Sequence, residues 1–416
     1  MFELLASVPA DTSGAQSAFN SLVKFLTTSP TALQVLWFML IAVLWTGYLV
    51  LEGFDFGVGM LLPILGKSNK ERRAMISSIG PWWDGNEVWL LTAGGATFAA
   101  FPEWYATLFS AAYLPLFLIL VGLIIRAVAF EYRSKVNSAR WHRNWDLCII
   151  IGSWLPSILW GVAFGDLVGG VPAFVDPTQV GGSKIGYAGN FWDLLVNSGT
   201  KGYALWFGLT TCLLFLAAGA VFTALKTDGD LRARAEKLAP KLEIAATVAT
   251  AICAVWLQLA FSKKGWTWII IAIAAICLLV GCYMSIKKHF GWTFTLNAVA
   301  VAGAVALLFG GLYPNVIRAS KVVMRGDALT SLGIANGQDI TSTVVKAGIT
   351  GLPIHAASSS PETLKIMTVV ACCLVPIVLL YQIWSFWVFH HRIAADRIPD
   401  DEDQIKDHTL MGSQSK

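Results

Sequence analysis

The amino-acid sequence predicts an all-α integral membrane protein with nine transmembrane helices, an extracytoplasmic N-terminus and a cytoplasmic C-terminus. Three observations support this fold class: the composition, the length of the apolar runs, and the distribution of basic residues between those runs. Of the 416 residues, 56% are hydrophobic and 13% are charged, and the mean hydropathy is +0.63. Because a soluble globular domain has about a quarter of its residues charged, this composition indicates several membrane spans.

Nine runs are long and apolar enough to cross a bilayer, whose hydrocarbon core requires about 20 residues of α-helix. The predicted spans lie at 33–54, 76–101, 105–130, 146–166, 202–225, 241–261, 266–286, 291–313 and 364–389. Together they define a predicted transmembrane domain over 33–389. No internal repeat is evident in it, and we expect no inserted water-soluble domain.

The segments around and between the spans complete the predicted organisation. Residues 1–32 have no basic stretch ahead of their apolar residues, so we expect an extracytoplasmic extension rather than a cleaved signal peptide. Two long outer loops are expected, 167–201 with Gly, Pro and Asp and 314–363 with Gly, Ser and Thr. Residues 390–416 are the predicted cytoplasmic tail.

The basic residues set the predicted orientation, because short loops on the cytoplasmic side of a membrane are enriched in Lys and Arg. With nine spans, the turns after the first, third, fifth and seventh spans lie on the same side as the C-terminal tail. These segments carry most of the 30 Lys and Arg residues. The alternation holds at every short loop except the one that contains Lys263 and Lys264. The side of the tail is therefore predicted to be cytoplasmic.

Four acidic residues lie within the apolar stretches. Glu52 and Asp55 occur in LEGFDFGVGML, at the expected cytoplasmic end of the first span. Asp84 and Glu87 occur in PWWDGNEVWLL, within the second span. Each pair has i, i+3 spacing, which places both carboxyl groups on one face of a helix. At 1.5 Å per residue the second pair lies roughly 10–15 Å into its span, and Arg126 lies at a similar depth near the end of the third span.

Ionisable residues inside a membrane face a helix-bundle interior or a partner, and they commonly mark proton or ion paths. Two interpretations of these five groups stay open. In the first, the acids conduct protons, with Asp84 as the foremost candidate because it is deep and is followed by Gly85, where backbone or water can approach. In the second, the groups are structural ion pairs in which Arg126 holds Asp55 or Asp84. The glycines of GFDFGVG indicate either a loosened helix end or a close helix crossing.

The sequence lacks the usual ligands and motifs of a redox or phosphate-binding centre. The six histidines lie in expected loops, at span ends or in the tail, whereas a membrane haem needs axial ligands such as His or Met. Met39 and Met367, near span ends, and the seven cysteines, which form no CxxC pair, are interpreted as packing residues. No phosphate-binding loop, nucleophile elbow, metal-spaced cluster or basic nucleic-acid stripe occurs. We therefore expect this chain to bind no haem, metal or nucleic acid.

Five blocks of the sequence resemble subunit II of cytochrome bd-type quinol oxidase. They are LEGFDFGVGML at 51–61, ERRAMISSIGPWWDGNEVWLLTAGGATFAAFP at 71–102, RAVAFEYRSK at 126–135, GSWLPSILWGVAFG at 152–165 and SSSPETLKIMT at 358–368. The blocks occur in order from near the start of the chain to near its end, so the resemblance covers almost the whole chain. The first two blocks in combination are highly specific.

The resemblance implies a fold, an activity and partners. Family members have two four-helix bundles plus one peripheral helix, and subunits I and II pair as a pseudo-symmetric heterodimer in the bacterial cytoplasmic membrane. The pair oxidises menaquinol or ubiquinol on the outer side and reduces O2 to water with cytoplasmic protons, which generates proton-motive force without pumping. The haem b and haem d-type groups belong to subunit I. Some members hold a structural quinone in subunit II, and such a quinone, a lipid or a small accessory single-span subunit stays open for this chain.

The family pattern also implies roles for individual residues. Asp84 matches the family aspartate that helps to line the cytoplasmic proton path, and we assign Glu87 and Glu52 to the same path. Asp55 and Arg126 match family positions, and we expect them to form a structural ion pair near the subunit interface.

Other interpretations concern both a residue and the whole chain. Trp89 matches a tryptophan near the lipid-side mouth of an apolar O2 channel in some members, and the alternative is an ordinary packing residue.

For the whole chain, the alternatives are a purely structural scaffold and a secondary transporter, since broken, Gly-rich helices with buried acids occur at transporter sites. The one-sided position of the acids and the lack of an inverted repeat favour the oxidase subunit over the transporter.

Overall fold

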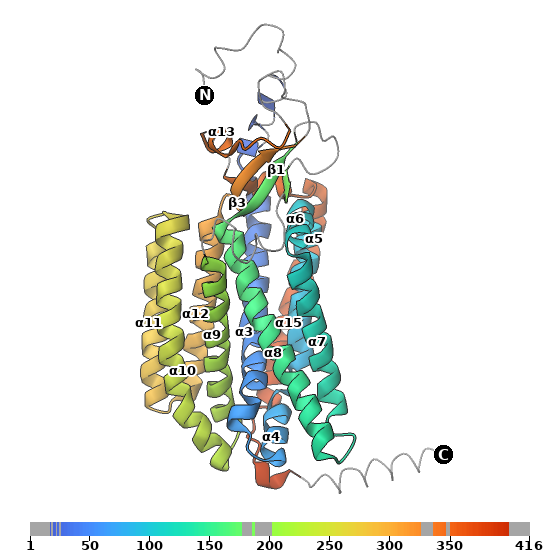
Figure 1. Ribbon diagram of the computed structural model, residues 1–416, viewed down its shortest axis with the longest axis vertical. Coiled ribbons are helices and arrows are strands. Elements are labelled where there is room, and N and C mark those ends of the chain that lie inside the picture. The colour runs from blue at the N-terminus through green and yellow to red at the C-terminus, as the bar shows by residue number, and fades with distance from the viewer. Residues whose placement is uncertain are drawn as a thin grey trace, which may run out of the picture.

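The chain folds into a long bundle of helices with a small β-sheet at one end, as the computed structural model shows (Figure 1). The structure describes residues 26–176, 185–187, 202–325, 336–346 and 350–398, and also 17, 20, 21, 23 and 24. We call the end of the bundle that carries the sheet the sheet end. The opposite end carries helix α4 (Asn69–Ile79), and we call it the α4 end.

Eight helices of the described part of the chain are long and apolar enough to cross a membrane. They are α3 (Ala32–Leu65), α7 (Tyr113–Tyr132), α8 (Ala139–Gly169), α9 (Tyr203–Lys226), α10 with its π-helical end η3 (Gly229–Ser262), α11 (Thr267–Ile286), α12 (Phe290–Leu312) and α15 (Pro361–Val388). Each corresponds to a predicted span, so the prediction of a mostly helical, multi-span membrane protein is confirmed. The predicted number of nine transmembrane helices is not confirmed.

The remaining predicted span, 76–101, is divided into two helices. Helix α4 ends at Ile79, and α5 (Trp83–Ala100) begins after a turn that contains Gly80 and Pro81. Proline lacks the N–H group that a continuing helix needs. Gly80 still has helical dihedral angles, whereas Trp82 does not, so the helix is interrupted after Gly80. The start of the third predicted span is likewise a separate short helix, α6 (Pro102–Ala111), ahead of α7.

The two predicted outer loops contribute a four-stranded sheet that the sequence analysis did not predict. Its strands are β1 (Val171–Val175), β2 (Ile185–Tyr187), β3 (Asn315–Met324) and β4 (Gly351–Pro353), in the order β2-β1-β3-β4. Strand β1 is antiparallel to β2 and parallel to β3, whereas β3 and β4 are antiparallel. The positive φ of Gly170, 98°, turns the chain from the end of α8 directly into β1. The short helices α13 (Thr341–Lys346) and α14 (Ile354–Ala357) lie against the sheet.

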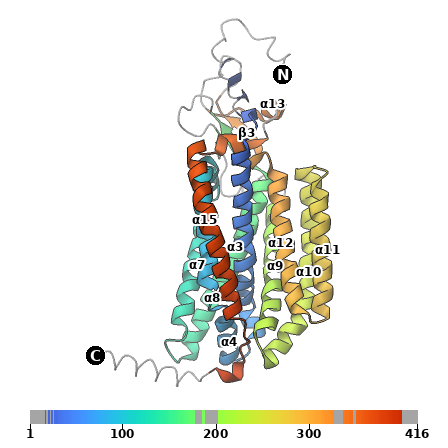
Figure 2. The same ribbon diagram turned by 180° about the vertical axis from the view of Figure 1, so that it is seen from behind.

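Helices α3 and α9 form the middle of the bundle. Helices α10, α11 and α12 lie on one side of them, and α5, α7 and α8 lie on the other (Figures 1 and 2). Helix α15 is peripheral: it packs against α3 and α5, and none of its most apolar stretch is buried. Where α3 crosses α9, a Cβ atom on Gly57 would lie 2.8 Å from the Cα of Gly219. Of the two readings of the GFDFGVG glycines, the structure therefore shows the close helix crossing.

Lys264, part of the exception to the pattern of basic loops, caps a helix at the sheet end. Its Nζ donates hydrogen bonds to the carbonyl oxygens of Gly310, at 2.7 Å, and of Gly311 and Tyr313, where α12 ends. Burial, and then the nearby Arg318, lowers the pKa of Lys264. This side chain neutralises the partial negative charge of a helix C-terminus, so it does not act as a free loop charge.

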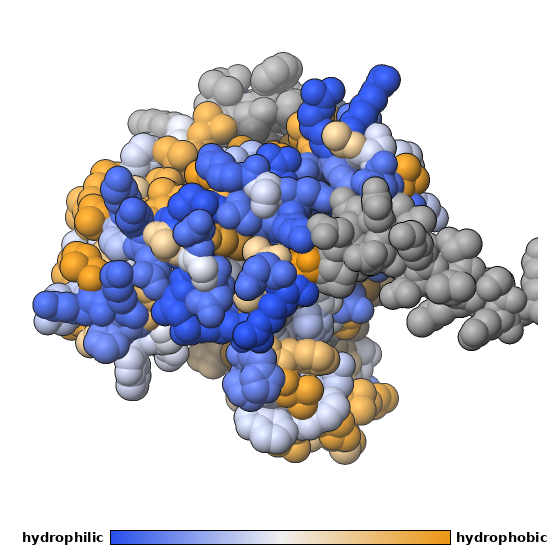
Figure 3. All heavy atoms as spheres, turned by 90° about the horizontal axis from the view of Figure 1, so that it is seen from below, coloured by the Kyte–Doolittle hydropathy of each residue, from blue (hydrophilic) through white to orange (hydrophobic). Residues whose placement is uncertain are grey.

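The α4 end is polar in the middle, with hydrophobic residues around its rim (Figure 3). Ion pairs there join the ends of different helices. They are Arg72–Asp146 at 2.9 Å, Arg133–Asp146, Arg234–Glu71 at 2.6 Å and Lys288–Glu236 at 2.9 Å. The helices are thus held in register at this end by charged groups and at the other end by the sheet.

Candidate functional site

Helices α3, α5 and α7 bring four of the predicted site residues together inside the bundle. Glu52 and Asp55 of α3 and Arg126 of α7 have no exposed surface. The Glu87 side chain of α5 retains 22% of its exposure. Three charged groups are therefore fully enclosed by protein, and a fourth lies between them and the surface.

Arg126 is the centre of this group. Its Nη1 donates to Glu52 Oε1, and the same nitrogen lies 3.8 Å from Glu87 Oε1. The guanidinium carbon lies 4.6 Å from the ring centroid of Phe56 and 5.2 Å from that of Phe130, which adds cation–π attraction. A buried arginine that contacts two carboxylates keeps charged groups tolerable in an apolar interior.

Asp55 does not form the ion pair with Arg126 that the sequence analysis expected. Its Oδ2 accepts a hydrogen bond of 2.7 Å from Asn86 Nδ2, and its Oδ1 has no hydrogen-bond partner in the described part of the chain. Asp55 lies one helical turn after Glu52 and has the shorter side chain. Glu52 therefore reaches the guanidinium, while the amide on α5 engages Asp55.

Asn86 was missed by the sequence analysis, although it is fully buried and links three helices. Besides bonding to Asp55 it donates to the carbonyl oxygen of Leu51 at 3.3 Å, and its Oδ1 accepts from Gln382 of α15 at 3.3 Å. The available signal was an amide between two acids in an otherwise apolar helix. Buried polar groups need partners, and here the partner is one of those acids.

Asp84 lies in the first turn of α5 and is exposed on the surface of this chain. Its Oδ1 accepts from the backbone N–H of Gly85 at 2.7 Å, and it forms no ion pair among the described residues. A helix N-terminus favours a carboxylate. Glu87 follows one turn later on the same helix, so the acids of α5 lead from the surface towards Arg126.

Trp89 packs against α3. A Cβ atom on Gly47 would lie 2.3 Å from Trp89 Cε3, so the indole fits over a position that only glycine leaves open. Beyond it, an apolar groove of about 500 Å³ opens between α5 and α7, lined among others by Leu91, Gly95 and Phe117. Trp89 does not itself line that groove.

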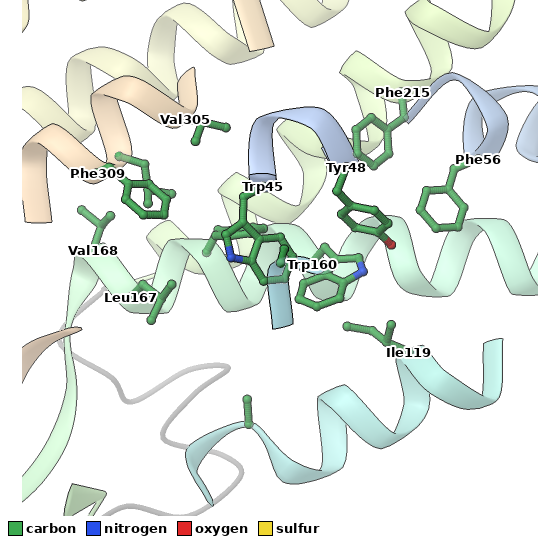
Figure 4. Close-up of a cluster of buried hydrophobic side chains, with 14 of the residues drawn as sticks. Trp45, Tyr48, Phe56, Ile119, Trp160, Leu167, Val168, Phe215, Val305 and Phe309 are labelled. Carbon is green, nitrogen blue, oxygen red and sulfur yellow. The ribbon is translucent and has the colours of Figure 1, made fainter. Parts of the chain in front are cut away.

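The polar groups continue past Glu52 into an aromatic cluster (Figure 4). Tyr48, one turn before Glu52 on α3, is fully buried and faces Trp160 of α8, with ring centroids 5.8 Å apart. Neither the Tyr48 hydroxyl nor the Trp160 Nε1 has a hydrogen-bond partner of normal geometry among the residues that the structure describes. Neither Tyr48 nor Trp160 was predicted from the sequence as part of the site. For Tyr48, the available signal was its i, i+4 spacing from Glu52.

Among the described residues, no group of three or more His, Cys, Asp or Glu side chains could hold a metal ion. The described histidines occur near helix ends or in connections: His142, His289, His355, His390 and His391. His408 lies outside the described residues. No pair of these histidines faces across the interior of the bundle as axial haem ligands would.

Known proteins share both the sequence and the fold of this chain. Residues 33–389 match the family model for cytochrome bd terminal oxidase subunit II. Cytochrome bd ubiquinol oxidase subunit 2 of Bacillus subtilis is 36% identical over 87% of this chain and 97% of its own length. The bd-I subunit 2 of Escherichia coli is 33% identical over 88% of this chain and 96% of its own.

A structural comparison gives the same result at the level of the fold. A chain in the structure of bd oxidase from Geobacillus thermodenitrificans superposes with a TM-score of 0.60 and 17% identity. The match covers 86% of this chain and 99% of the other. The resemblance seen in the sequence is confirmed: this chain belongs to the cytochrome bd terminal oxidase subunit II family.

Proposed function

We propose that this chain is the haem-free subunit II of a quinol oxidase of the bacterial cytoplasmic membrane. The complex couples oxidation of menaquinol or ubiquinol to reduction of O2 to water and to formation of proton-motive force. Family membership and the names of the relatives support this function. The haem b and haem d-type groups are assigned to subunit I, the partner, and a small accessory single-span subunit is a further candidate partner.

In this proposal α5 is the ninth span, and the two groups of helices around α3 and α9 correspond to two four-helix bundles with α15 as the peripheral helix. The α4 end faces the cytoplasm, which is supported by its basic residues, among them Arg72, Arg234 and Lys288. The sheet end, with loops 167–201 and 314–363 and the extension 1–32, faces outward. Residues 390–416 form the cytoplasmic tail.

The chain's own contribution is a cytoplasmic proton path through Asp84, Glu87 and Glu52. The observation that supports it is the graded burial of three carboxyl groups on adjacent helices: Asp84 is exposed, Glu87 is partly exposed, and Glu52 is fully buried. Glu87 lies 3.8 Å from Arg126 and so is held less tightly than Glu52. A carboxyl group relays protons most readily when water reaches it and no partner fixes its charge. Asp84 and Glu87 come closest to this condition, and Glu52, paired with Arg126, is assigned to the inner end of the path.

We also propose that the region of Trp89 gives access to O2, which partitions into apolar space. The adjacent apolar groove between α5 and α7 supports this role. Asp55 and Arg126 act as structural groups near the subunit interface, with Asn86 and Glu52 as their respective partners. A structural quinone or lipid stays a further proposal, for which the apolar cavity of about 80 Å³ among α9, α10, α11 and α12 has room only for part of a tail.

The first test is co-purification of the chain in mild detergent with a reduced-minus-oxidised absorption spectrum. A partner subunit that brings haem b and haem d-type bands is expected. A colourless chain that stays folded without a partner would contradict the function.

The proton path is tested with Asp84→Asn in the assembled complex, reconstituted in liposomes. Loss of a proton-transfer group is expected to lower quinol oxidase turnover and proton uptake on the order of a hundredfold, with haem content unchanged. The matched control is Asp230→Asn, which alters another exposed acid in the first turn of a helix at the α4 end. If Asp84→Asn keeps full turnover and proton uptake, Asp84 is not a relay.

A further inference from the structure

A second buried carboxyl group lies in the other half of the bundle, among α10, α11 and α12. Glu243 of α10 has no exposed surface. Asn297 of α12 donates a hydrogen bond from Nδ2 to Glu243 Oε1 at 2.7 Å. Within the described part of the chain Glu243 forms no ion pair. The nearby cations Arg232 and Lys288 pair instead with Glu236, two turns closer to the α4 end.

Three buried polar atoms on α10, α11 and α12 have no hydrogen-bond partner among the described residues. They are Glu243 Oε2, Asn297 Oδ1 and the hydroxyl of Ser285 on α11. The amide oxygen of Asn297 can only accept hydrogen bonds, and while Glu243 is ionised the same is true of its carboxylate oxygen. An unpaired buried acceptor is costly, and the one possible donor among the three atoms, the Ser285 hydroxyl, is hydrogen-bonded to neither oxygen.

Polar groups extend from this site towards the α4 end. On α11, Gly281 faces Asn297, whose Oδ1 would lie 3.5 Å from a Cβ atom at Gly281. Thr293, one turn before Asn297, donates to the Gly281 carbonyl at 3.4 Å. Ser285 lies one turn after Gly281 and directly precedes the turn that joins α11 to α12. Hydroxyl and amide side chains therefore lie between Glu243 and the polar end of the bundle.

We propose that Glu243, Asn297 and Ser285 form a second proton-binding site, separate from the acids around Arg126. Glu243 carries a proton in the resting protein and exchanges it with water at the α4 end past Ser285. An ionised carboxylate without a cation is disfavoured within a membrane. The proton removes that charge and supplies the donor that the neighbouring oxygens lack. This inference stands on residues that the proposed proton path does not use.

The other titratable groups on the helices packed against Glu243 leave it without a charged neighbour. Cys282 of α11 is close to it, and the Cys282 Sγ lies 3.2 Å from the hydroxyl of Thr247, one turn further along α10. None of the titratable groups on α9 and at the start of α12 is hydrogen-bonded to Glu243: Tyr203, Cys212, Lys226 and His289.

The test is an infrared spectrum of the assembled complex at neutral pH, compared between the natural protein and Glu243→Gln. The natural protein should show a carbonyl stretch of a protonated carboxylic acid that shifts in D2O and is absent from Glu243→Gln. The band should be the same with and without Na⁺. Glu236→Gln, a matched change on the same helix at a surface ion pair, should leave the band intact.

Three outcomes would overturn the proposal. Carboxylate bands in place of the acid band would show that Glu243 is ionised, and an acid band that appears only without Na⁺ would assign the site to a metal cation. An unchanged D2O exchange rate in Ser285→Ala, where slowing of several-fold is expected, would exclude the route past Ser285. If Glu243→Gln fails to assemble, Asn297→Ala serves instead, because loss of its hydrogen bond to Oε1 must shift the same band.

Discussion

Two glutamates are buried to the same degree in the two halves of the bundle, but they have different partners. Glu52 of α3 contacts the guanidinium of Arg126, whereas Glu243 of α10 accepts a hydrogen bond from the amide of Asn297. Burial disfavours the charged form of both carboxyl groups, and only Glu52 has a cation beside it that offsets part of this cost. The two acids therefore differ in the partner that compensates for burial rather than in burial itself.

The surroundings of the two sites also differ, in how far each site continues to the surface of the chain. The group around Arg126 adjoins Glu87 and the exposed Asp84, so it continues to the surface of the chain. Glu243 is buried in the half formed by α10, α11 and α12, and hydroxyl and amide side chains lie between it and the α4 end. A charged site with an acidic entrance suits proton transfer to a partner. An enclosed neutral site suits retention of a proton.

Replacement of Arg126 by Met is expected to have the largest effect, since it leaves Glu52 buried without a cation. Breaking a buried ion pair on one side costs about 3–5 kcal/mol. The midpoint of thermal unfolding of the assembled complex should fall accordingly. In Glu243→Gln no cation loses its partner and the amide can still be hydrogen-bonded, so its midpoint should stay close to that of the natural protein. Equal losses in the two variants would contradict the contrast between the halves.

Gly57→Ala tests the contact that joins the two halves. The added Cβ atom would approach the Phe215 carbonyl oxygen and the Gly219 backbone, which cannot move aside without separating α3 from α9. Overpacking of this kind costs about 1–3 kcal/mol, sometimes more. The control is Gly291→Ala in the first turn of α12, where nothing lies within 4 Å of the new atom. The midpoint of thermal unfolding should fall for Gly57→Ala and stay unchanged for Gly291→Ala. An unchanged midpoint in both variants would contradict the close crossing.

Asn297→Ala examines the neutral site. It removes the only hydrogen bond to Glu243 within the described residues and leaves a buried polar group unsatisfied, which costs about 1–3 kcal/mol. A double variant with Glu243→Leu removes both polar groups and is expected to recover part of the loss. If the double variant loses more stability than the two single variants lose together, the pair is not the isolated neutral contact described above.

The smallest expected effect concerns the ion pair of Glu71 and Arg234, which ties α4 to α10 at 2.6 Å. Burial acts to raise the pKa of Glu71, but hydrogen bonds from Arg234 and from the backbone of Lys67 and Ser68 outweigh it and lower the pKa. The stabilisation is therefore present above the pKa of the unfolded state and is lost as the pH falls through the lowered folded pKa.

For a pair near the surface this contribution is about 1 kcal/mol or less. The difference in thermal midpoint between the natural complex and Glu71→Gln should shrink as the pH is lowered into the acid range. A difference that does not depend on pH would indicate that packing rather than charge joins these helices.

The helices were predictable from the sequence because apolar length alone marks a span. The predicted 202–225 and 266–286 differ by a residue or so from α9 and α11. The sheet was not predictable, because β2 and β4 have three residues each and the pairing of β1 with β3 joins two loops that are far apart in the sequence. The family resemblance implied one peripheral helix but did not say which, and the structure places α15 at the periphery.

For the site, the sequence identified the acids and Arg126 but not their pairing. The i, i+3 spacing puts Glu52 and Asp55 on one face, so either could have met the guanidinium. The choice depends on side-chain length and on Asn86, whose amide comes from a different helix. Glu243 was not singled out, because a single acid in a predicted span has no local pattern that separates a buried site from a helix end.

The order in which the sheet can form has a consequence for biosynthesis. Residue Val171 of β1 pairs with Ala319 of β3, which leaves the ribosome about 150 residues later. At about 5–20 residues per second this interval is roughly 7–30 s. During that time helices α9 to α12 must be made and inserted, while β1 has only its antiparallel neighbour β2. Closure of the β1–β3 ladder thus marks the moment at which both halves of the bundle have entered the membrane.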